Sequence, residues 1–483
     1  MIINNGKERK LVVVSNRLPF TRQVDPDGKD VWQKSTGGLI TAMDPILRST
    51  NGVWVGWDGQ PVASLKGNFG VFESSEVDPE NIKGKGSYRI ASVPITAREY
   101  KQYYVKFSNG TLWALFHYFF EHSSLNYGAW KVYETVNNRF AHYINEITDE
   151  DDIIWVQDFH LFMVPYYLRK LRPNAKIHFF LHIPFPHSDI FSILPWQKLI
   201  TESLLCCDSV GFHHKQYLKN FRGAIESFRR EKHNAGTKSI ENAVNTHIYA
   251  NPISIDFENI DNTSRLESVL KRKDEIKKQS GCPKIMLGID RIDYSKGIKE
   301  RLLGLELLLQ KHPELRETFF YYQLVIPSRE ELTAYSSLKK KIDEIIGRIN
   351  GKFSTGLWTP IHYNYGTVKF KELVALYLAA YIALVTPLRD GMNLVCKEFI
   401  AAHSDNDGVL VLSKFAGAIY EIKNCLAVNP YSIEDIANAI HQALQMPGPE
   451  RRKRMKKMRK NISHNNIDKW LEICLENFEK GGE

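Results

Sequence analysis

The sequence has 483 residues, more than one hydrophobic core usually serves, so we expect two domains. Its composition is 43% apolar, 12% aromatic and 25% charged, which excludes a largely disordered chain, a fibrous chain and a small disulfide-held scaffold. The net charge of +9 could suggest nucleic acid, but eight cationic residues lie between positions 451 and 460 and the remaining chain is nearly neutral. We interpret this basic cluster as the solvated face of a late helix and expect no nucleic-acid partner.

The cysteines and the apolar runs indicate the compartment. The six cysteines form no CxxC pair and no regular framework, which is typical of free thiols in a reducing environment. Only four consecutive apolar residues precede Ser15, fewer than the core of a signal peptide needs. The longest apolar run, residues 373–385, is 13 residues long, against the roughly 18 that a membrane span needs. We therefore expect a cytoplasmic protein with no membrane segment.

Short runs rich in valine, isoleucine and leucine alternate with longer patterns typical of amphipathic helices. These runs predict buried strands at residues 11–15, 152–157, 176–183, 284–290, 321–327, 381–387 and 408–413. Continuous apolar strands separated by helices are typical of parallel sheets covered on both faces. The length accommodates two such sheets, so the expected fold class is α/β with two Rossmann-like domains.

The best domain boundary lies in the extended stretch YANPISIDFENI, which precedes a long charged helix near residues 264–279. The expected domains are residues 1–255 for the first, 256–445 for the second, and a helical segment at 446–483 that packs back on the first. In open α/β sheets, ligands bind beyond the carboxyl ends of the strands. Polar residues that directly follow each strand are therefore the candidates for chemistry.

One such candidate follows the predicted strand at 284–290. Arg291 and Lys296 lie five residues apart in a loop that leads into an apolar helix, and Gly297 allows a close backbone approach. Two fixed cations suit the oxygens of a bound phosphate. The alternative is a surface loop with ordinary solvated side chains.

A second candidate follows the predicted strand at 381–387. Asp390 lies in its loop, and the next helix, LVCKEFIAA, would offer the free amides of Leu394 and Val395 to an anion or a hydroxyl. Glu398 falls among apolar positions of this helix, where a carboxylate needs a hydrogen-bonding partner such as a ribose diol. The alternative is an ion pair between Glu398 and a nearby lysine or arginine.

The amino-terminal half offers aromatic side chains with isolated polar groups. Pyranose faces stack on rings while sugar hydroxyls and phosphates need carboxylates and cations, so this set suits a phosphorylated sugar. The candidates are Arg17, Gly37, Gly38, Trp54, Trp57, Tyr104, Trp113, Asp158 and His182. Each signal is weak alone, because the aromatic residues could be core, Asp158 could cap a helix and His182 could be an interior histidine.

Several other chemistries lack their motifs. The sequence has no GxxxxGK[ST] for a P-loop, no GxGxxG after a strand, and no HExxH or paired CxxC for zinc. His213 and His214 have no third ligand at a useful spacing. We therefore expect a site without metal or cofactor, in which Arg291 and Lys296 neutralise a leaving diphosphate.

A dozen ordered motifs between about residue 10 and residue 475 resemble the trehalose-6-phosphate synthase family. They are SNRLPF, STGGL, GVWVGW, FSNGTLW, IIWVQDFHL, FFLHIPFP, NPISID, GIDRIDYSKGI, RINGK, WTPIHY, TPLRDGMNLVCKE and VLVLSKFAGA. The resemblance implies a GT-B glycosyltransferase, in which two Rossmann-like domains face a cleft between them. It also implies retaining transfer of glucose from UDP-glucose to glucose 6-phosphate, which yields trehalose 6-phosphate and UDP.

The resemblance also implies roles for individual residues. Arg291 and Lys296 would hold the UDP diphosphate, and His182 would touch the donor glucose at the reacting centre. The other donor-binding residues would be Gly37, Gly38, Val368, Asp390, Leu394, Val395 and Glu398. The acceptor-binding residues would be Arg17, Trp57, Tyr104, Trp113, Asp158 and Arg329.

Two positions depart from the family pattern. Gln157 stands where the family usually has histidine, and Ala114 where it usually has proline, which bears on acceptor preference. Two alternatives remain: a synthase of the same fold with another acceptor or donor, such as a glucosylglycerol-phosphate synthase, and an inactive regulatory subunit. A separate trehalose-6-phosphate phosphatase would complete the pathway, and the chain could form a homo-oligomer.

Overall fold

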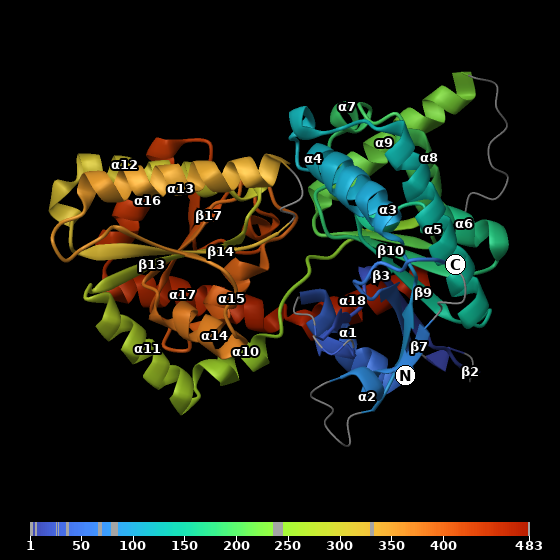
Figure 1. Ribbon diagram of the computed structural model, residues 1–483, viewed down its shortest axis with the longest axis horizontal. Coiled ribbons are helices and arrows are strands. Elements are labelled where there is room, and N and C mark those ends of the chain that lie inside the picture. The colour runs from blue at the N-terminus through green and yellow to red at the C-terminus, as the bar shows by residue number, and fades with distance from the viewer. Residues whose placement is uncertain are drawn as a thin grey trace. The chain divides into compact units, whose positions relative to one another are not determined.

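The computed structural model describes residues 3–4, 7–25, 27, 29–34, 38–65, 70–78, 86–234, 245–328 and 333–481. The chain forms two compact units, which are described separately (Figure 1). Unit 1 comprises Met1–Asn251 together with Leu471–Glu483, and unit 2 comprises Pro252–Trp470. Both are built on a largely parallel sheet with covering helices, so the predicted α/β class is confirmed.

Unit 1 contains an eight-stranded sheet in the order β12-β11-β10-β9-β3-β6-β8-β7. Its strands are β3 (Leu11–Arg17), β6 (Val53–Trp57), β7 (Gly70–Glu73), β8 (Arg89–Ser92), β9 (Ile153–Gln157), β10 (Lys176–Leu181), β11 (Ser209–Phe212) and β12 (His247–Ala250). All neighbours pair in parallel except the edge strand β7, which is antiparallel to β8. Every residue of β6 and β9 is buried, which requires cover on both faces of the sheet.

The remaining elements of unit 1 lie outside this sheet. The main helices are α1 (Gly38–Thr50), α2 (Ser74–Val77), α3 (Ala97–Glu99), α4 (Trp113–Phe116), α5 (Tyr127–Ile147), α6 (Val164–Leu171), α7 (Ser188–Phe191), α8 (Gln197–Leu204) and α9 (Lys215–Asn234). A π-helix, η1 (Tyr100–Leu112), joins α3 to α4. Two antiparallel pairs, β1 (Ile3–Asn4) with β2 (Lys7–Glu8) and β4 (Phe20–Val24) with β5 (Asp30–Lys34), lie outside the main sheet.

Unit 2 contains a six-stranded parallel sheet in the order β15-β14-β13-β16-β17-β18. Its strands are β13 (Lys284–Arg291), β14 (Phe319–Ile326), β15 (Ile361–Tyr365), β16 (Ile382–Val385), β17 (Val409–Ser413) and β18 (Leu426–Val428). Its helices are α10 (Phe257–Ser264), α11 (Glu267–Ser280), α12 (Ile298–Lys311), α13 (Thr333–Phe353), α14 (Phe370–Ala379), α15 (Leu394–Ala402), α16 (Ile433–Gln445) and α17 (Gly448–His464).

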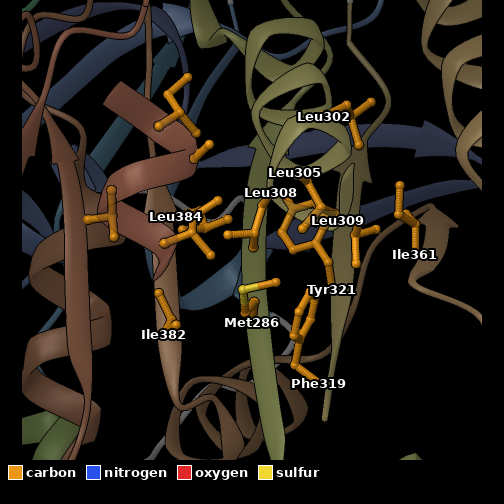
Figure 2. Packing of buried hydrophobic residues seen from close by; sticks show 14 of the residues in the cluster. Met286, Leu302, Leu305, Leu308, Leu309, Phe319, Tyr321, Ile361, Ile382 and Leu384 are labelled. Carbon is orange, nitrogen blue, oxygen red and sulfur yellow. The ribbon is translucent and has the colours of Figure 1, made fainter. Parts of the chain in front are cut away.

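The core of unit 2 forms where α12 packs on the sheet. Figure 2 shows Leu302, Leu305, Leu308 and Leu309 of α12 beside Met286 of β13, and all five are fully buried. The spacing of these leucines places them on one face of the helix, as the apolar pattern in the sequence predicts. Because this face is anchored, the amino-terminal end of α12 is held at the carboxyl edge of β13.

The structure confirms the strands predicted from apolar runs, and it differs at the domain boundaries. Unit 1 ends at Asn251 instead of residue 255, and the terminal segment 446–483 is divided between the units. Helix α17 belongs to unit 2, whereas the later part of α18 (Ile467–Lys480) packs on unit 1, where Phe478 stacks on His178 with ring centroids 4.0 Å apart. No helix among the described residues is long and apolar enough to cross a bilayer.

Candidate active site

The first candidate region lies where the connections of the unit 1 sheet change direction. From β3 the chain adds β6 and β8 on one side and β9 to β12 on the other. Loops at such a switch point diverge at the carboxyl edge of the sheet, where α/β proteins bind ligands. Arg17 ends β3 and Asp158 follows β9, so both candidate residues occupy this point.

The Arg17 guanidinium lies against aromatic rings. Its central carbon is 4.1 Å from the centroid of the Trp57 ring and 5.7 Å from that of Tyr104. Trp57 is fixed by a hydrogen bond from its Nε1 to the Gln60 carbonyl at 3.0 Å. Gly59, with φ of 95°, leaves room for the guanidinium, because a Cβ there would lie 2.5 Å from Arg17 Nη1. This arrangement holds a cation beside aromatic surface, as a phosphorylated sugar requires.

Tyr104 and Trp113 belong to neighbouring helices and have different surroundings. Tyr104, half-buried in η1, stacks on the His160 ring with centroids 5.6 Å apart. Trp113, buried at the start of α4, stacks on His117 at 4.0 Å. The structure therefore joins Tyr104 to the Arg17 stack, while Trp113 packs in the interior of the unit.

Asp158 occupies an unusual backbone position between β9 and the short helix η3 (Phe159–Leu161). Its φ of 72° lies in a region that residues other than glycine rarely adopt. Asp158 stands at the cap position of η3, yet its side chain makes no capping hydrogen bond. Its Oδ1 accepts a hydrogen bond from the His182 backbone N–H at 3.2 Å instead. This contact joins the loops that follow β9 and β10.

Both the side chain and the backbone of His182 make hydrogen bonds. Its Nε2 lies 2.9 Å from Gln157 Oε1, and its carbonyl oxygen accepts a hydrogen bond from His213 Nε2 at 3.1 Å. Burial lowers the pKa of His182 to about 3, because desolvation disfavours the charged imidazolium. The ring is therefore neutral near pH 7. Gln157, a position that departs from the family pattern, thus contacts a candidate catalytic residue, whereas Ala114 lies in the core.

The second candidate region is the switch point of the unit 2 sheet. From β13 the chain adds β14 and β15 on one side and β16 to β18 on the other, so the loops after β13 and β16 diverge here. Lys296 comes from the first loop and Asp390 from the second. The Lys296 Nζ lies 2.6 Å from Asp390 Oδ2, and both side chains are nearly buried. A buried lysine and carboxylate that neutralise each other place opposite charges at the strand ends.

The backbones of these two loops are joined directly. The Ser295 carbonyl accepts hydrogen bonds from the Leu388 N–H at 2.7 Å and the Arg389 N–H at 3.3 Å. Gly297 adopts φ of 64°, and a Cβ there would lie 2.2 Å from the Thr386 carbonyl oxygen. Only glycine permits this approach, which explains the residue that follows Lys296.

Helix α15 begins beside this pair of loops. Asn393, with φ of 69°, precedes the helix and donates a hydrogen bond from Nδ2 to Asp390 Oδ2 at 3.1 Å. Its Oδ1 is buried without a partner among the described residues. The first-turn amides of Leu394 and Val395 have no partner within a helix by geometry. This helix end therefore offers donors and an acceptor to a ligand.

Glu398 lies one turn further along α15. Its Oε2 accepts a hydrogen bond from the Tyr377 hydroxyl at 2.7 Å, and no lysine or arginine in the described part of the chain forms an ion pair with it. Burial raises the pKa of Glu398, although the Tyr377 hydrogen bond opposes that shift. The alternative of a structural ion pair is therefore wrong for the described residues, and a hydroxylated ligand remains a suitable partner.

For the remaining candidate residues, the structure shows position and exposure but few contacts. Arg291 ends β13 with an exposed side chain, and Val368 is half-buried in the loop after β15, at the same edge of the sheet. Gly38 begins α1. Gly37 and Arg329 lie outside the described residues, so their predicted roles have no structural test here.

A group of His312, Glu314 and His441 brings three metal-binding side chains within 4.8 Å among the described residues. The two imidazole rings stack with centroids 3.8 Å apart and planes 14° apart. A metal must lie near the plane of each imidazole that binds it, and two nearly parallel stacked rings do not meet this condition. This group therefore does not form a metal site as it stands.

Sequence reasoning missed three contributors to the site: Tyr377, Asn393 and Arg301. Asn393 lies within the motif TPLRDGMNLVCKE and Tyr377 within the apolar run before it, but their contacts with Asp390 and Glu398 depend on the fold. Arg301 was not a candidate from the sequence, and it is fully buried in α12. The sequence signal for its burial was a charged residue among the apolar positions of a helix, where a charge is buried only if it is paired.

Two Rossmann-like units are the architecture of glycosyltransferases of the GT-B fold, and the chain has this fold. The chain belongs to glycosyltransferase family 20, whose model matches residues 9–480. It is 37% identical over 486 aligned residues to a trehalose-6-phosphate synthase of Mycolicibacterium paratuberculosis, covering 98% of this chain and 95% of the relative.

Solved structures are similar over the same length. A UDP-forming α,α-trehalose-phosphate synthase from Burkholderia xenovorans, in complex with glucose-6-phosphate, is 32% identical with a TM-score of 0.85, covering 97% of this chain and 100% of that chain. An E. coli structure bound with UDP-2-fluoro glucose is 32% identical with a TM-score of 0.84, covering 97% and 98% of the two chains.

Proposed function

We propose that this chain is a trehalose-6-phosphate synthase that transfers glucose from UDP-glucose to glucose 6-phosphate. The observation that carries the proposal is the buried pair of Lys296 and Asp390 at the unit 2 switch point, with the Arg17 stack at the unit 1 switch point. Relatives of the family bind the two substrates separately: glucose-6-phosphate in one structure and a UDP-glucose analogue in another.

The donor assignment follows from the charges of unit 2. Arg291 and Lys296 supply positive charge for the diphosphate, and the free amides of Leu394 and Val395 add donors. Asp390 and Glu398 accept hydrogen bonds from sugar hydroxyls, with Glu398 on the ribose diol. Val368 lies two strands away at the same edge, where its backbone can contact the base.

The acceptor assignment follows from the aromatic surroundings of unit 1. The Arg17 guanidinium binds the phosphate of glucose 6-phosphate, while Trp57 and Tyr104 present ring faces to the sugar. Asp158 accepts hydrogen bonds from acceptor hydroxyls, and Trp113 supports this wall from the interior.

In the reaction, the bond between the donor anomeric carbon and the diphosphate oxygen breaks, and the anomeric hydroxyl oxygen of glucose 6-phosphate forms the new bond on the same face. The acceptor proton passes to the departing diphosphate oxygen. Arg291 and Lys296 stabilise the negative charge that develops there, and neutral His182 orients the donor glucose. Fixed cations can do this without a metal ion or a cofactor.

The wider setting is also part of the proposal. All six cysteines are free and three are buried, which agrees with a reducing, cytoplasmic environment. The product keeps its phosphate, so a separate trehalose-6-phosphate phosphatase would complete the pathway. A homo-oligomer is compatible with this account.

The test is a product assay with purified protein, UDP-glucose and glucose 6-phosphate in the presence of EDTA. We expect UDP and a phosphorylated, non-reducing disaccharide with both anomeric carbons in the α configuration. Glycerol 3-phosphate and ADP- or GDP-glucose serve as competing substrates. A preference for one of these would show another synthase of the same fold, and no product with any of them would indicate a non-catalytic subunit.

A further inference from the structure

Arg301 is a fully buried arginine in the second turn of α12, with no exposed side-chain surface. A guanidinium buried in this way lowers stability unless its charge and its N–H groups find partners. The apolar face of α12 needs no arginine for its packing, since leucines fill the interface with the sheet. The contacts of Arg301 therefore indicate what it does.

Side chains of β13 and β14 bind one end of the guanidinium, and one of them is a carboxylate that balances its charge. The Arg301 Nη1 donates to Asp290 Oδ2 at 2.6 Å, to Gln323 Oε1 at 3.1 Å and to the Tyr321 hydroxyl at 3.2 Å. Burial alone would lower the pKa of Arg301, but the Asp290 carboxylate keeps it above its ordinary value. Arg301 is thus a permanent cation fixed to β13 and β14.

The Nε and Nη2 groups of Arg301 contact the two loops that follow β13 and β16. The Arg301 Nε donates to Thr386 Oγ1 at 3.0 Å, and Nη2 lies 3.3 Å from the Lys296 carbonyl oxygen. Thr386 directly follows β16, and Lys296 lies in the loop after β13. A single rigid, planar group therefore connects the two loops at the switch point of unit 2.

We propose that Arg301 is a positioning residue, whose guanidinium sets the register between the Lys296 loop and the Thr386 loop and so fixes the Lys296 ammonium for the donor diphosphate. This inference rests on the proposed role of Lys296 in binding that diphosphate. It adds a residue that touches neither substrate but determines how well the cation is aligned.

Arg301→Lys separates positioning from neutralisation. A lysine retains the positive charge and can still pair with Asp290, but it lacks the planar fork that reaches Thr386 and Lys296 together. If Arg301 only balances the charge of Asp290, this variant should bind ligands normally. If it sets the register of the loops, donor binding should weaken while acceptor binding stays the same.

Arg451 offers a matched control at the opposite end of β16. Its guanidinium also bridges a carboxylate, a tyrosine hydroxyl and a backbone carbonyl, namely Asp407 at 2.8 Å, Tyr381 at 2.7 Å and Met446 at 2.9 Å. Tyr381 precedes β16, so these contacts lie at the amino edge of the sheet. Arg451→Lys thus removes a similar guanidinium from unit 2 at the end of β16 opposite the site loops.

The experiment measures UDP affinity by calorimetry, steady-state kinetics and thermal unfolding for the wild type, Arg301→Lys, Arg451→Lys and Thr386→Val. For Arg301→Lys we expect UDP affinity and kcat to fall about tenfold or more, while KM for glucose 6-phosphate changes less than about twofold. Arg451→Lys should lower the unfolding temperature with UDP affinity within about twofold of the wild type.

Thr386→Val keeps Arg301 and removes only one acceptor, so UDP affinity should fall about threefold. This variant decides the question if Arg301→Lys does not fold. Unchanged UDP affinity in the folded variants, or equal losses in Arg301→Lys and Arg451→Lys, would overturn the proposal. A wild type that forms no product from UDP-glucose and glucose 6-phosphate would refute the proposed function instead.

Discussion

The two switch points share a topology and differ in chemistry. In unit 1 the loops after β3 and β9 meet beside aromatic rings, with Arg17 stacked on Trp57 and a neutral His182 nearby. In unit 2 the loops after β13 and β16 meet at the buried pair of Lys296 and Asp390. The same arrangement of parallel strands therefore presents one cation on an aromatic surface in unit 1 and a network of paired charges in unit 2.

This difference indicates which ligand each unit suits. A sugar monophosphate offers an apolar ring face and one charged group, which aromatic rings and a guanidinium suit. A nucleoside diphosphate develops charge during transfer, so it needs cations that are already held in place when the bond breaks. Substitutions in the two regions should therefore affect different substrates.

The largest expected effect is that of Lys296→Ala. Loss of the ammonium removes the stabilisation of the leaving diphosphate and takes away the lysine that pairs with Asp390, so kcat should fall on the order of 100-fold or more. UDP release from UDP-glucose and glucose 6-phosphate measures the change. Lys284→Ala is the control, because Lys284 lies at the amino end of β13, the strand that precedes the Lys296 loop, and contacts the Leu444 carbonyl. Near-normal turnover of Lys296→Ala would remove this residue from the mechanism.

Arg17→Ala should act mainly on the acceptor. Hydrogen bonds to a charged phosphate contribute roughly 1.5–3 kcal/mol, so KM for glucose 6-phosphate should rise about 10- to 100-fold, with kcat changed much less. Arg172→Ala is the control in unit 1, because this guanidinium binds carbonyl oxygens of Asn145 and Thr148 before β10 begins. If Arg17→Ala weakens UDP binding instead, the division between the units is wrong.

Glu398→Gln should weaken UDP binding by about tenfold, because the amide is a poorer acceptor for a ribose diol than the carboxylate. Burial raises the pKa of Glu398, so wild-type UDP affinity should fall when the pH drops through that pKa, and this pH dependence should be absent in the variant. Calorimetry with UDP and with 2′,3′-dideoxyuridine diphosphate tests the assignment. Equal losses for both nucleotides would place Glu398 away from the ribose.

The smallest effect concerns the stability of unit 1. Burial lowers the pKa of His178 to about 3, while an unfolded chain takes up this proton near pH 6.5. The contribution of His178 to the free energy of unfolding is therefore full above pH 6.5 and is lost progressively as the pH falls towards 3. His178→Gln should reduce this slope by at most about 1.4 kcal/mol per pH unit, measured by urea unfolding. An unaltered slope in His178→Gln would contradict the burial argument.

Seven of the fourteen described strands in the two main sheets were predicted from sequence, because they are long apolar runs buried on both faces. The continuous apolar runs of β3, β9 and β16 have this cause, and each appeared close to its predicted position. The antiparallel pair β4 and β5 mixes polar and apolar residues, and the π-helix η1 has no simple period. Neither offers the periodic signal on which sequence reasoning depends.

The candidate site could be predicted only in part, for a related reason. Motifs identified loops and residue types, such as the cations of the loop after β13. They could not show that Lys296 pairs with a carboxylate 94 residues away, or that Arg301 is buried among side chains of other strands. Pairings between distant segments depend on strand order and register, which a local pattern does not contain.

The most direct test of the division between the units is a crystal structure with UDP and glucose 6-phosphate bound together. We expect the UDP diphosphate on Arg291 and Lys296, and the sugar phosphate on Arg17. Density for UDP against the Arg17 stack, or for the sugar phosphate beside Lys296, would show that this division is wrong.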